Sequence, residues 1–328
     1  MKILIVDKSA VIPVEKYGGT ERVIWGLGKE LSKLGHEIYF LVKEGSSCDF
    51  GKIIPFDIQK TIKDQIPENI DVIHFNHTIT EKIEKPFIVT MHGNPSPNQT
   101  IDINTVFISK NQAKRFGSST FVYNGLDWDD YPEPDLDQER TYLHFLGKAA
   151  WKVKNVFGAA KIALESNNNL HILGGERWNF RNFKRGLKYV LNPKIIFRGM
   201  VNNETKMEIL QYSKGLLFPV KWHEPFGLAI IESLYAGCAV FGTKNGSLPE
   251  LITPEVGFTG TNANEIAKAI RNFDYNPRKC HEYAVKHFNS KVMTGSYLKL
   301  YEKVISGETI NKEVPEYKEA ENVVPKFS

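Results

Sequence analysis

The stretch WHEPFGLAIIE, residues 222–232, connects an apolar run at 215–219 to a run with helical spacing. This order predicts a strand, a loop and a helix. Gly227 removes a side chain at the first turn, so backbone N–H groups can approach an anion there with the helix dipole behind them. Glu224 and Glu232 carry carboxylates that accept hydrogen bonds from sugar or ribose hydroxyls. The alternative from these residues alone is a helix-end charge and a solvated helix residue.

The same alternation of short apolar runs and helical runs continues on both sides of this stretch. Strand-like runs lie at 2–7, 38–42, 72–75, 87–90, 106–109, 121–122, 142–146, 170–173, 194–197, 215–219 and 239–242. Helical spacing is found at 23–34, 156–165, 180–190, 204–213, 227–236, 265–273 and 292–304. Strands that alternate with helices favour βαβ units and parallel sheets, so the predicted fold class is α/β.

A change of composition divides the chain. Its 328 residues are enough for two domains. The segment 127–140 (DWDDYPEPDLDQER) is acidic, contains prolines and has few apolar residues, which is typical of a linker. We therefore predict an N-terminal domain at 1–126 and a C-terminal domain at 141–289. The segment 307–328 has no apolar period and is expected to be a flexible tail.

Composition narrows the class of protein. Apolar residues make up 41% and charged residues 24% of the chain, as in globular proteins. No apolar run approaches the roughly 18 residues of a membrane span, and the N-terminal run is too short for a signal peptide. The 3 cysteines lie far apart, which argues against a disulfide framework or a zinc site. We expect a soluble, intracellular protein.

The charge is distributed unevenly along the chain. Residues 1–130 hold 15 Lys and Arg against 17 Asp and Glu, a net charge of −2, whereas residues 141–289 hold 20 against 11, a net charge of +9. Such an excess suggests an anionic ligand for the C-terminal half. No nucleic-acid-binding motif accompanies it, so a small phosphate-bearing ligand is favoured over nucleic acid.

The form EPFGLAIIE, followed by GCAV and GSLPE, resembles the retaining GT-B glycosyltransferases of glycosyltransferase family 4. The resemblance extends through most of the chain, with further motifs YGGTERV (17–23), VTMHG (89–93), NGLD (124–127), FLG (145–147), LGG (173–175) and FRG (197–199). It implies two Rossmann-like domains whose parallel sheets face a central cleft. It also implies that the segment 290–306 crosses back onto the N-terminal domain.

The resemblance assigns roles to residues of the EPFGLAIIE motif. It implies that Glu224 contacts the donor sugar and that Glu232 holds the ribose of the nucleotide. It implies that the amides at Phe226, Gly227 and Leu228 cradle the sugar or the diphosphate.

Three lysines follow the FLG motif where the family has cations for the diphosphate. Lys148 stands where the family usually has Arg, which keeps the charge but loses the bidentate fork. Lys154 lies one position later than the usual Lys, and Lys152 competes with it for this role. A solvated loop is the alternative for all three.

Two motifs of the N-terminal half also match the family. Gly18 and Gly19 match a Gly-rich loop near the donor phosphates and the acceptor, although an ordinary strand-to-helix turn would look similar. His92 matches a histidine near the reacting centre, which would contact the donor sugar. Without the resemblance, a lone histidine after a strand is more often structural.

The resemblance predicts a metal-independent, retaining transferase of the hexosyltransferase type. It would move sugar from a nucleotide-diphosphate sugar to a glycan or a lipid-linked acceptor, with no cofactor, in the cytoplasm or at the inner face of the membrane. Two alternatives use the same fold: an epimerase or phosphorylase of nucleotide sugars or glycans, and a non-catalytic nucleotide-sugar-binding protein.

Other signals point elsewhere and are weaker. Asp127-Trp128-Asp129 has the DxD form of a metal motif, but Asp127 already belongs to NGLD. His74 and His77 could be half of a metal site, although no further ligands accompany them. The segment 177–189 interleaves basic and aromatic residues. It could contact an anionic membrane or RNA, but a basic helix packed on the sheet is the favoured interpretation.

Overall fold

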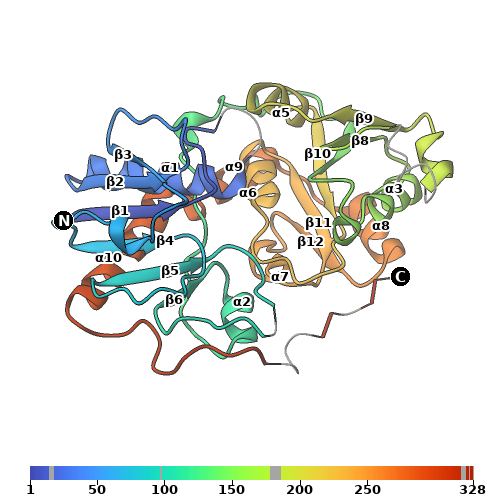
Figure 1. The fold of residues 1–328 in the computed structure, drawn as a ribbon. Coiled ribbons are helices and arrows are strands. Elements are labelled where there is room, and N and C mark those ends of the chain that lie inside the picture. The colour runs from blue at the N-terminus through green and yellow to red at the C-terminus, as the bar shows by residue number, and fades with distance from the viewer. Residues whose placement is uncertain (15–17, 97, 178–185, 319–322, 325, 328) are drawn as a thin grey trace. The chain divides into compact units, whose positions relative to one another are not determined.

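The computed structural model describes residues 1–14, 18–96, 98–177, 186–318, 323, 324, 326 and 327. The chain folds as two compact units (Figure 1). Unit 1 consists of Met1–Trp128 and Phe288–Asn322, and unit 2 consists of Asp129–His287 and Val323–Ser328. Among the described residues, no helix has the length and apolar character needed to span a membrane.

Unit 1 is built on a six-stranded parallel sheet in the order β3-β2-β1-β4-β5-β6. Its strands are β1 (Lys2–Asp7), β2 (Glu37–Val42), β3 (Lys52–Pro55), β4 (Val72–Phe75), β5 (Phe87–Met91) and β6 (Thr105–Phe107). Its helices are α1 (Gly19–Lys33), α2 (Lys110–Arg115), α10 (Ser290–Ile305) and a 3₁₀ turn, Lys63–Gln65. The central strands are almost wholly buried, as expected for a parallel sheet covered on both faces.

Helix α10, which comes late in the chain, packs against α1, β4 and β5. Its buried Tyr301 hydroxyl lies 2.7 Å from Nδ1 of His74 on β4, and Nε2 of His74 lies 2.7 Å from the hydroxyl of Thr90 on β5. The Tyr297 hydroxyl is 3.0 Å from the same Thr90 oxygen. Burial lowers the pKa of His74 to about 3, so this network is neutral at ordinary pH.

Unit 2 repeats this architecture, with six parallel strands in the order β12-β11-β10-β7-β8-β9. The strands are β7 (Tyr142–Leu146), β8 (Leu170–Leu173), β9 (Ile195–Gly199), β10 (Ser213–Phe218), β11 (Ala239–Thr243) and β12 (Gly257–Gly260). The helices include α3 (Val156–Glu165), α5 (Asn203–Leu210), α6 (Leu228–Tyr235), α7 (Leu248–Leu251), α8 (Ala263–Asn272) and α9 (Pro277–His287), with 3₁₀ turns at Trp128–Asp130 and Lys152–Lys154.

Both sheets have the same topology when their strands are numbered within each unit. In each, the first and fourth strands lie side by side at the centre, β1 beside β4 and β7 beside β10. This is the doubly wound Rossmann order, and it confirms the predicted α/β class. In such sheets ligands bind at the carboxyl ends of the two central strands, where the direction of winding reverses. We call this position the switch point of each unit.

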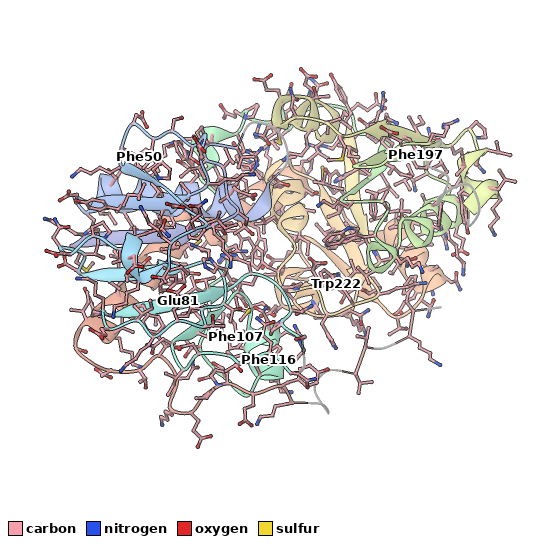
Figure 2. The ribbon with its side chains drawn as sticks, viewed as in Figure 1. Phe50, Glu81, Phe107, Phe116, Phe197 and Trp222 are labelled. Carbon is pink, nitrogen blue, oxygen red and sulfur yellow. The ribbon has the colours of Figure 1, made fainter. Side chains whose placement is uncertain are left out.

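The segment after residue 307 was predicted to be a flexible tail, and this is wrong for residues 308–318. They run along unit 1 (Figure 1), where Asn311 donates from Nδ2 to the carbonyls of Ile103 and Thr105 at 2.7 and 2.8 Å. Its Oδ1 accepts from the Ser118 hydroxyl at 2.6 Å. The ring of Tyr317 packs against Phe116, which is labelled in Figure 2. Side-chain amide and backbone hydrogen bonds hold this segment, so it needs no apolar period.

Smaller differences concern element ends and edges. The run at 106–109 is shorter as a strand because Ser109 caps α2, accepting from the Gln112 amide. The run at 121–122 contributes only an isolated bridge from Phe121 to Phe107. Elements β3, β12, α2, α7 and α9 were not predicted. Of the helix expected at 180–190, residues 180–185 lie outside the described residues, and 186–190 are helical.

Candidate functional site

The switch point of unit 2 is formed by the loop after β7, residues 147–155, and the loop after β10, residues 219–227. The two loops are joined by hydrogen bonds. Lys221 donates its N–H to the Val153 carbonyl at 2.7 Å, and Asn155 donates from Nδ2 to the Pro219 carbonyl at 2.8 Å. Asn155 also caps α3, so one side chain fixes both the loop pair and the start of the helix.

The N-terminus of α6 lies at this switch point. Gly227 precedes the helix with a φ of +90°, and no side chain caps the helix. Among the described residues, none accepts a hydrogen bond from the N–H groups of Gly227 and Leu228. Uncapped N–H groups at a helix start, with the dipole behind them, form an anion site. The resemblance implies that the amides at Phe226, Gly227 and Leu228 cradle the sugar or the diphosphate, and this role stays a prediction; Phe226 is buried.

The GSLPE motif packs against the loop before α6 and forms hydrogen bonds with its backbone. Gly246 has a φ of +65°, and a Cβ there would lie 2.3 and 2.4 Å from the backbone N and O of Glu224. Only glycine allows this approach. The neighbouring Ser247 donates its N–H to the Glu224 carbonyl at 3.0 Å and its hydroxyl to the Phe226 carbonyl at 2.7 Å. The motif therefore fixes the backbone that carries Glu224.

Glu224 is 5% exposed and forms an ion pair with a predicted site lysine. Its Oε2 accepts from Lys154 Nζ at 2.7 Å and from Trp222 Nε1 at 2.7 Å (Trp222 is labelled in Figure 2). Lys154 Nζ also lies 4.9 Å over the Phe218 ring and 5.2 Å over the Trp222 ring. None of the described residues donates to Glu224 Oε1. A buried cation and a carboxylate with one open oxygen thus stand side by side.

The other two lysines of this loop lie differently. Lys148 is exposed, and its Nζ is 5.1 Å from the centre of the Trp151 ring. Lys152 is exposed and begins the 3₁₀ turn Lys152–Lys154. Of the three candidates, the structure brings Lys154 to Glu224.

Glu232, one turn into α6, is also buried rather than solvated, with 9% exposure. Its Oε1 accepts from Lys206 Nζ at 2.6 Å and from the Tyr131 hydroxyl at 2.8 Å. Sequence reasoning found neither partner, because Lys206 is 26 residues and Tyr131 is 101 residues away along the chain. No local pattern in the sequence predicts this contact, because it joins side chains from distant segments of the chain.

The switch point of unit 1 holds the predicted His92, directly after β5. Its Nε2 donates to Asn76 Oδ1 at 2.9 Å, and Asn76 donates its N–H to the Val6 carbonyl at the end of β1. Burial lowers the pKa of His92 to about 4, so the ring is neutral at ordinary pH. Gly18 precedes α1 and Gly19 begins it, while residues 15–17 of the same motif lie outside the described residues.

The competing metal motifs are engaged in other contacts. Asp127 of the DxD motif pairs with Lys29 at 2.7 Å, within unit 1. His74 is bound by Tyr301 and Thr90. Across the described part of the chain, no three His, Cys, Asp or Glu side chains gather as a metal site would require. Of the basic segment at 177–189, residues 178–185 lie outside the described part, so a membrane or RNA contact there stays untested.

Comparison with a family model identifies the C-terminal segment. Residues 128–287, a range close to the main segment of unit 2, match the model described as Glycosyl transferases group 1. The motifs that carry the predicted resemblance include EPFGLAIIE and GSLPE, which lie in this segment.

Two curated relatives are similar to this chain. An uncharacterized 41.2 kDa protein of the cps region of Klebsiella pneumoniae is 26% identical over 216 residues, which cover 59% of this chain and 56% of that protein. The chain thus spans little more than half the length of this relative. N-acetyl-alpha-D-glucosaminyl L-malate synthase of Bacillus anthracis is 23% identical over 372 residues, covering 90% of this chain and 96% of that protein.

Two solved structures share the fold over nearly the whole chain. AviGT4, a glycosyltransferase involved in avilamycin A biosynthesis, aligns with a TM-score of 0.78 at 21% identity, covering 94% of this chain and 99% of its own. HepE of Anabaena in complex with UDP and glucose aligns with a TM-score of 0.64 at 14% identity, covering 91% and 98%. Together with the family model, they confirm the predicted resemblance to GT-B glycosyltransferases; retention of configuration and membership of family 4 stay predictions.

Proposed function

We propose that this chain, which has the GT-B fold and a segment similar to group 1 glycosyltransferases, transfers a sugar from a nucleotide-diphosphate sugar to a glycan or lipid-linked acceptor. The observation that carries the proposal is the uncapped start of α6 beside the buried pair of Lys154 and Glu224. An anion site, a cation and a carboxylate with one open oxygen fit a diphosphate linked to a sugar. The complex of HepE with UDP and glucose supports this ligand class.

The contacts of Lys154 suggest how the donor is received. In the structure its charge is balanced by Glu224. The donor diphosphate would draw Lys154 toward it and release Glu224 to accept hydrogen bonds from sugar hydroxyls. When the bond between the anomeric carbon and the phosphate oxygen breaks, negative charge grows on the diphosphate. Lys154 and the N–H groups of Gly227 and Leu228 would stabilise that charge, and fixed donors of this kind account for much of the rate enhancement in many enzymes.

We extend the proposal to a metal-independent reaction that retains the configuration of the sugar. Fixed N–H groups and lysines supply the positive charge that a divalent ion provides elsewhere. Retention follows the family resemblance, in which the leaving phosphate accepts the proton of the acceptor hydroxyl as that hydroxyl attacks the same face of the sugar. Unit 1 would bind the acceptor; following the resemblance, the loop with Gly18 and Gly19 would lie near the donor phosphates and the acceptor, and His92 would contact the donor sugar. No cofactor is needed.

A donor panel tests the function. The full chain is incubated with UDP-, GDP- and ADP-sugars, with and without glycan acceptors, and products are followed by chromatography and NMR. We expect donor consumption that depends on acceptor, persists in excess EDTA and gives a product with the anomeric configuration of the donor. Conversion of the donor without acceptor would indicate an epimerase, and nucleotide binding with no turnover would indicate a non-catalytic protein. Loss of turnover in EDTA that Mn²⁺ restores would contradict metal independence.

A further inference from the structure

The buried lysine beside Glu232 is not explained by the donor site as described so far. We infer that Lys206 and Tyr131 are positioning residues, which hold Glu232 so that one oxygen only is presented to the ribose of the nucleotide. The inference rests on the proposed function, because it concerns how the nucleotide of the donor is recognised. Neither side chain was implicated by sequence motifs.

The geometry separates the two oxygens of Glu232. Both donors, Lys206 Nζ and the Tyr131 hydroxyl, bind Oε1, at 2.6 and 2.8 Å. Within the described part of the chain, Oε2 accepts no hydrogen bond, and the side chain keeps 11% of its surface exposed. Two donors on one oxygen fix both the position and the rotation of the carboxylate. Oε2 therefore remains as a fixed acceptor for a ligand hydroxyl.

Lys206 itself is poorly placed to bind a ligand. Its side chain is 9% exposed, with Glu232 on one side and the Tyr131 ring 5.3 Å from Nζ on another. An incoming phosphate would have to displace one of them. Lys206 therefore acts through Glu232.

The energetics of the fold do not explain Lys206 either. A buried ion pair is often no more stabilising than two apolar side chains of similar size, because both charges lose their hydration. Lys206 lies in the first turn of α5, where the helix dipole disfavours a cation. The ion pair with Glu232 and the Tyr131 ring 5.3 Å from Nζ offset this cost. The lost hydration of the ion pair and the unfavourable helix dipole are both explained if Lys206 serves to hold Glu232 as an acceptor for ribose hydroxyls.

The experiment compares a ribonucleoside diphosphate with its 2′-deoxy counterpart, using the base that the wild-type chain prefers. Calorimetry gives both dissociation constants for the full chain and its variants. We expect the wild type to prefer the ribonucleotide by about tenfold or more, as for a hydrogen bond to a charged group. Lys206→Met should reduce this ratio to near one, and Tyr131→Phe should reduce it in part. A role in packing alone would not change the ratio.

Control variants separate the alternatives. Lys214→Met removes one exposed lysine from β10, away from Glu232, and should leave the ratio unchanged. Lys206→Met leaves Glu232 buried without its cation and could prevent folding. In that case the ratio is measured in Tyr131→Phe alone, since this variant removes only a hydroxyl. Ratios in Tyr131→Phe and Lys206→Met that equal the wild-type ratio would overturn the inference. Equal weakening of both nucleotides by Lys206→Met would overturn it in favour of direct phosphate binding.

Two outcomes in the wild type concern the proposed function instead. If the wild type binds both nucleotides equally, the ribose role of Glu232 is wrong, and the positioning roles are wrong with it. If the wild type binds no nucleoside diphosphate, the donor site fails as a whole. Full discrimination in the wild type with loss in both variants supports the inference.

Discussion

The switch points of the two units are alike in topology and different in chemistry. In unit 1, the strand ends hold His92, whose ring is neutral because burial lowers its pKa to about 4, its partner Asn76, and the buried carboxylate of Asp7, which accepts from the N–H groups of Ser9 and Ala10. In unit 2, the loop before α6 and α6 itself carry two largely buried ion pairs, Lys154 with Glu224 and Lys206 with Glu232. The same strand order thus fixes where a ligand binds, and the side chains at that edge decide which ligand it is.

Below these edges the two sheets are built similarly. Each has a buried histidine on a central strand, His74 on β4 and His144 on β7. His144 lies 2.7 Å from the Ser213 hydroxyl and 2.9 Å from that of Ser233, and burial lowers its pKa to about 3. Each sheet thus has a neutral, hydrogen-bonded histidine on a central strand.

The largest expected effect is on transfer by Lys154→Met. Removing this cation should lower kcat by about 10²- to 10³-fold, as for other fixed groups that stabilise a developing negative charge. It should also weaken binding of the nucleoside diphosphate. His92→Phe, the counterpart in unit 1, should lower transfer but leave nucleotide binding unchanged. Steady-state kinetics measure transfer and calorimetry measures nucleotide binding in both variants. Equal weakening of nucleotide binding by Lys154→Met and His92→Phe would contradict the predicted difference between the units.

Stability is the control for this variant. Lys154→Met leaves Glu224 buried without its cation, which costs about 3–5 kcal/mol. In the double variant Lys154→Met/Glu224→Gln both charges are gone, so stability should recover while transfer does not. Urea unfolding gives the free energy of unfolding of both variants. This shows whether transfer is lost because the protein unfolds or because the cation is missing.

The second prediction is that His74 in unit 1 and His144 in unit 2 contribute equally to the acid sensitivity of the fold. His74 and His144 have ordinary pKa values of 6.5 in the unfolded chain and about 3 in the folded chain, because burial disfavours the charged ring. Their contribution to stability is therefore complete above pH 6.5 and falls as the pH drops toward 3, by about 1.4 kcal/mol per pH unit for each histidine. Urea unfolding between about pH 7 and pH 4.5, a range inside that window, measures this slope.

Variants at these positions sharpen the same comparison. His74→Asn and His144→Asn should each flatten the pH dependence by the contribution of one proton. If only one of them does so, the histidines are not equivalent and the likeness of the two sheets does not extend to their energetics.

The third prediction concerns the contact between the rest of unit 1 and residues 308–318, which follow the main stretch of unit 2 in the chain. Asn311→Ala removes the side chain that binds Ile103, Thr105 and Ser118, and should lower the free energy of unfolding by about 1–3 kcal/mol. Nucleotide affinity, which depends on unit 2, should not change. Thermal and urea unfolding give the first quantity and calorimetry the second. Unaltered stability would mean that residues 308–318 contribute nothing to unit 1.

The smallest effect is expected for the two exposed lysines of the loop after β7. Lys148→Met should weaken nucleotide binding by about 0.5–1 kcal/mol, since an exposed charge interacts weakly with its partner. Lys152→Met should have less effect, because Lys154, with which it competes for the second cation position, is the lysine that pairs with Glu224. Calorimetry measures both affinities, and a larger loss for Lys152→Met than for Lys148→Met would contradict this ranking.

The sequence predicted the buried parts of the fold better than its edges. Strands such as β1 and β4 are continuous apolar runs because both faces of a parallel sheet are covered. The edge strands β3 and β12 were missed, since KIIP ends in proline and GFTG contains two glycines. Short edge strands need little apolar surface and leave little signal.

The site shows the same limit. Glu224, Lys154 and the start of α6 could be predicted because one motif and a family pattern contain them. Lys206 and Tyr131 could not, because each meets Glu232 through tertiary contacts between distant segments. The residues next to Lys206 in the sequence do not distinguish a buried lysine from a solvated lysine on a helix.

The discontinuity of unit 1 has a consequence for synthesis on the ribosome. Unit 2 consists almost entirely of one unbroken stretch, whereas unit 1 requires α10 and residues 308–318 from beyond it. During translation, the six strands of the N-terminal sheet emerge first, but the helix that covers β4 and β5 emerges only after the main stretch of unit 2. Unit 1 is therefore begun before unit 2 and finished after it. In the interval, an apolar face of its sheet is exposed to chaperones and to other nascent chains.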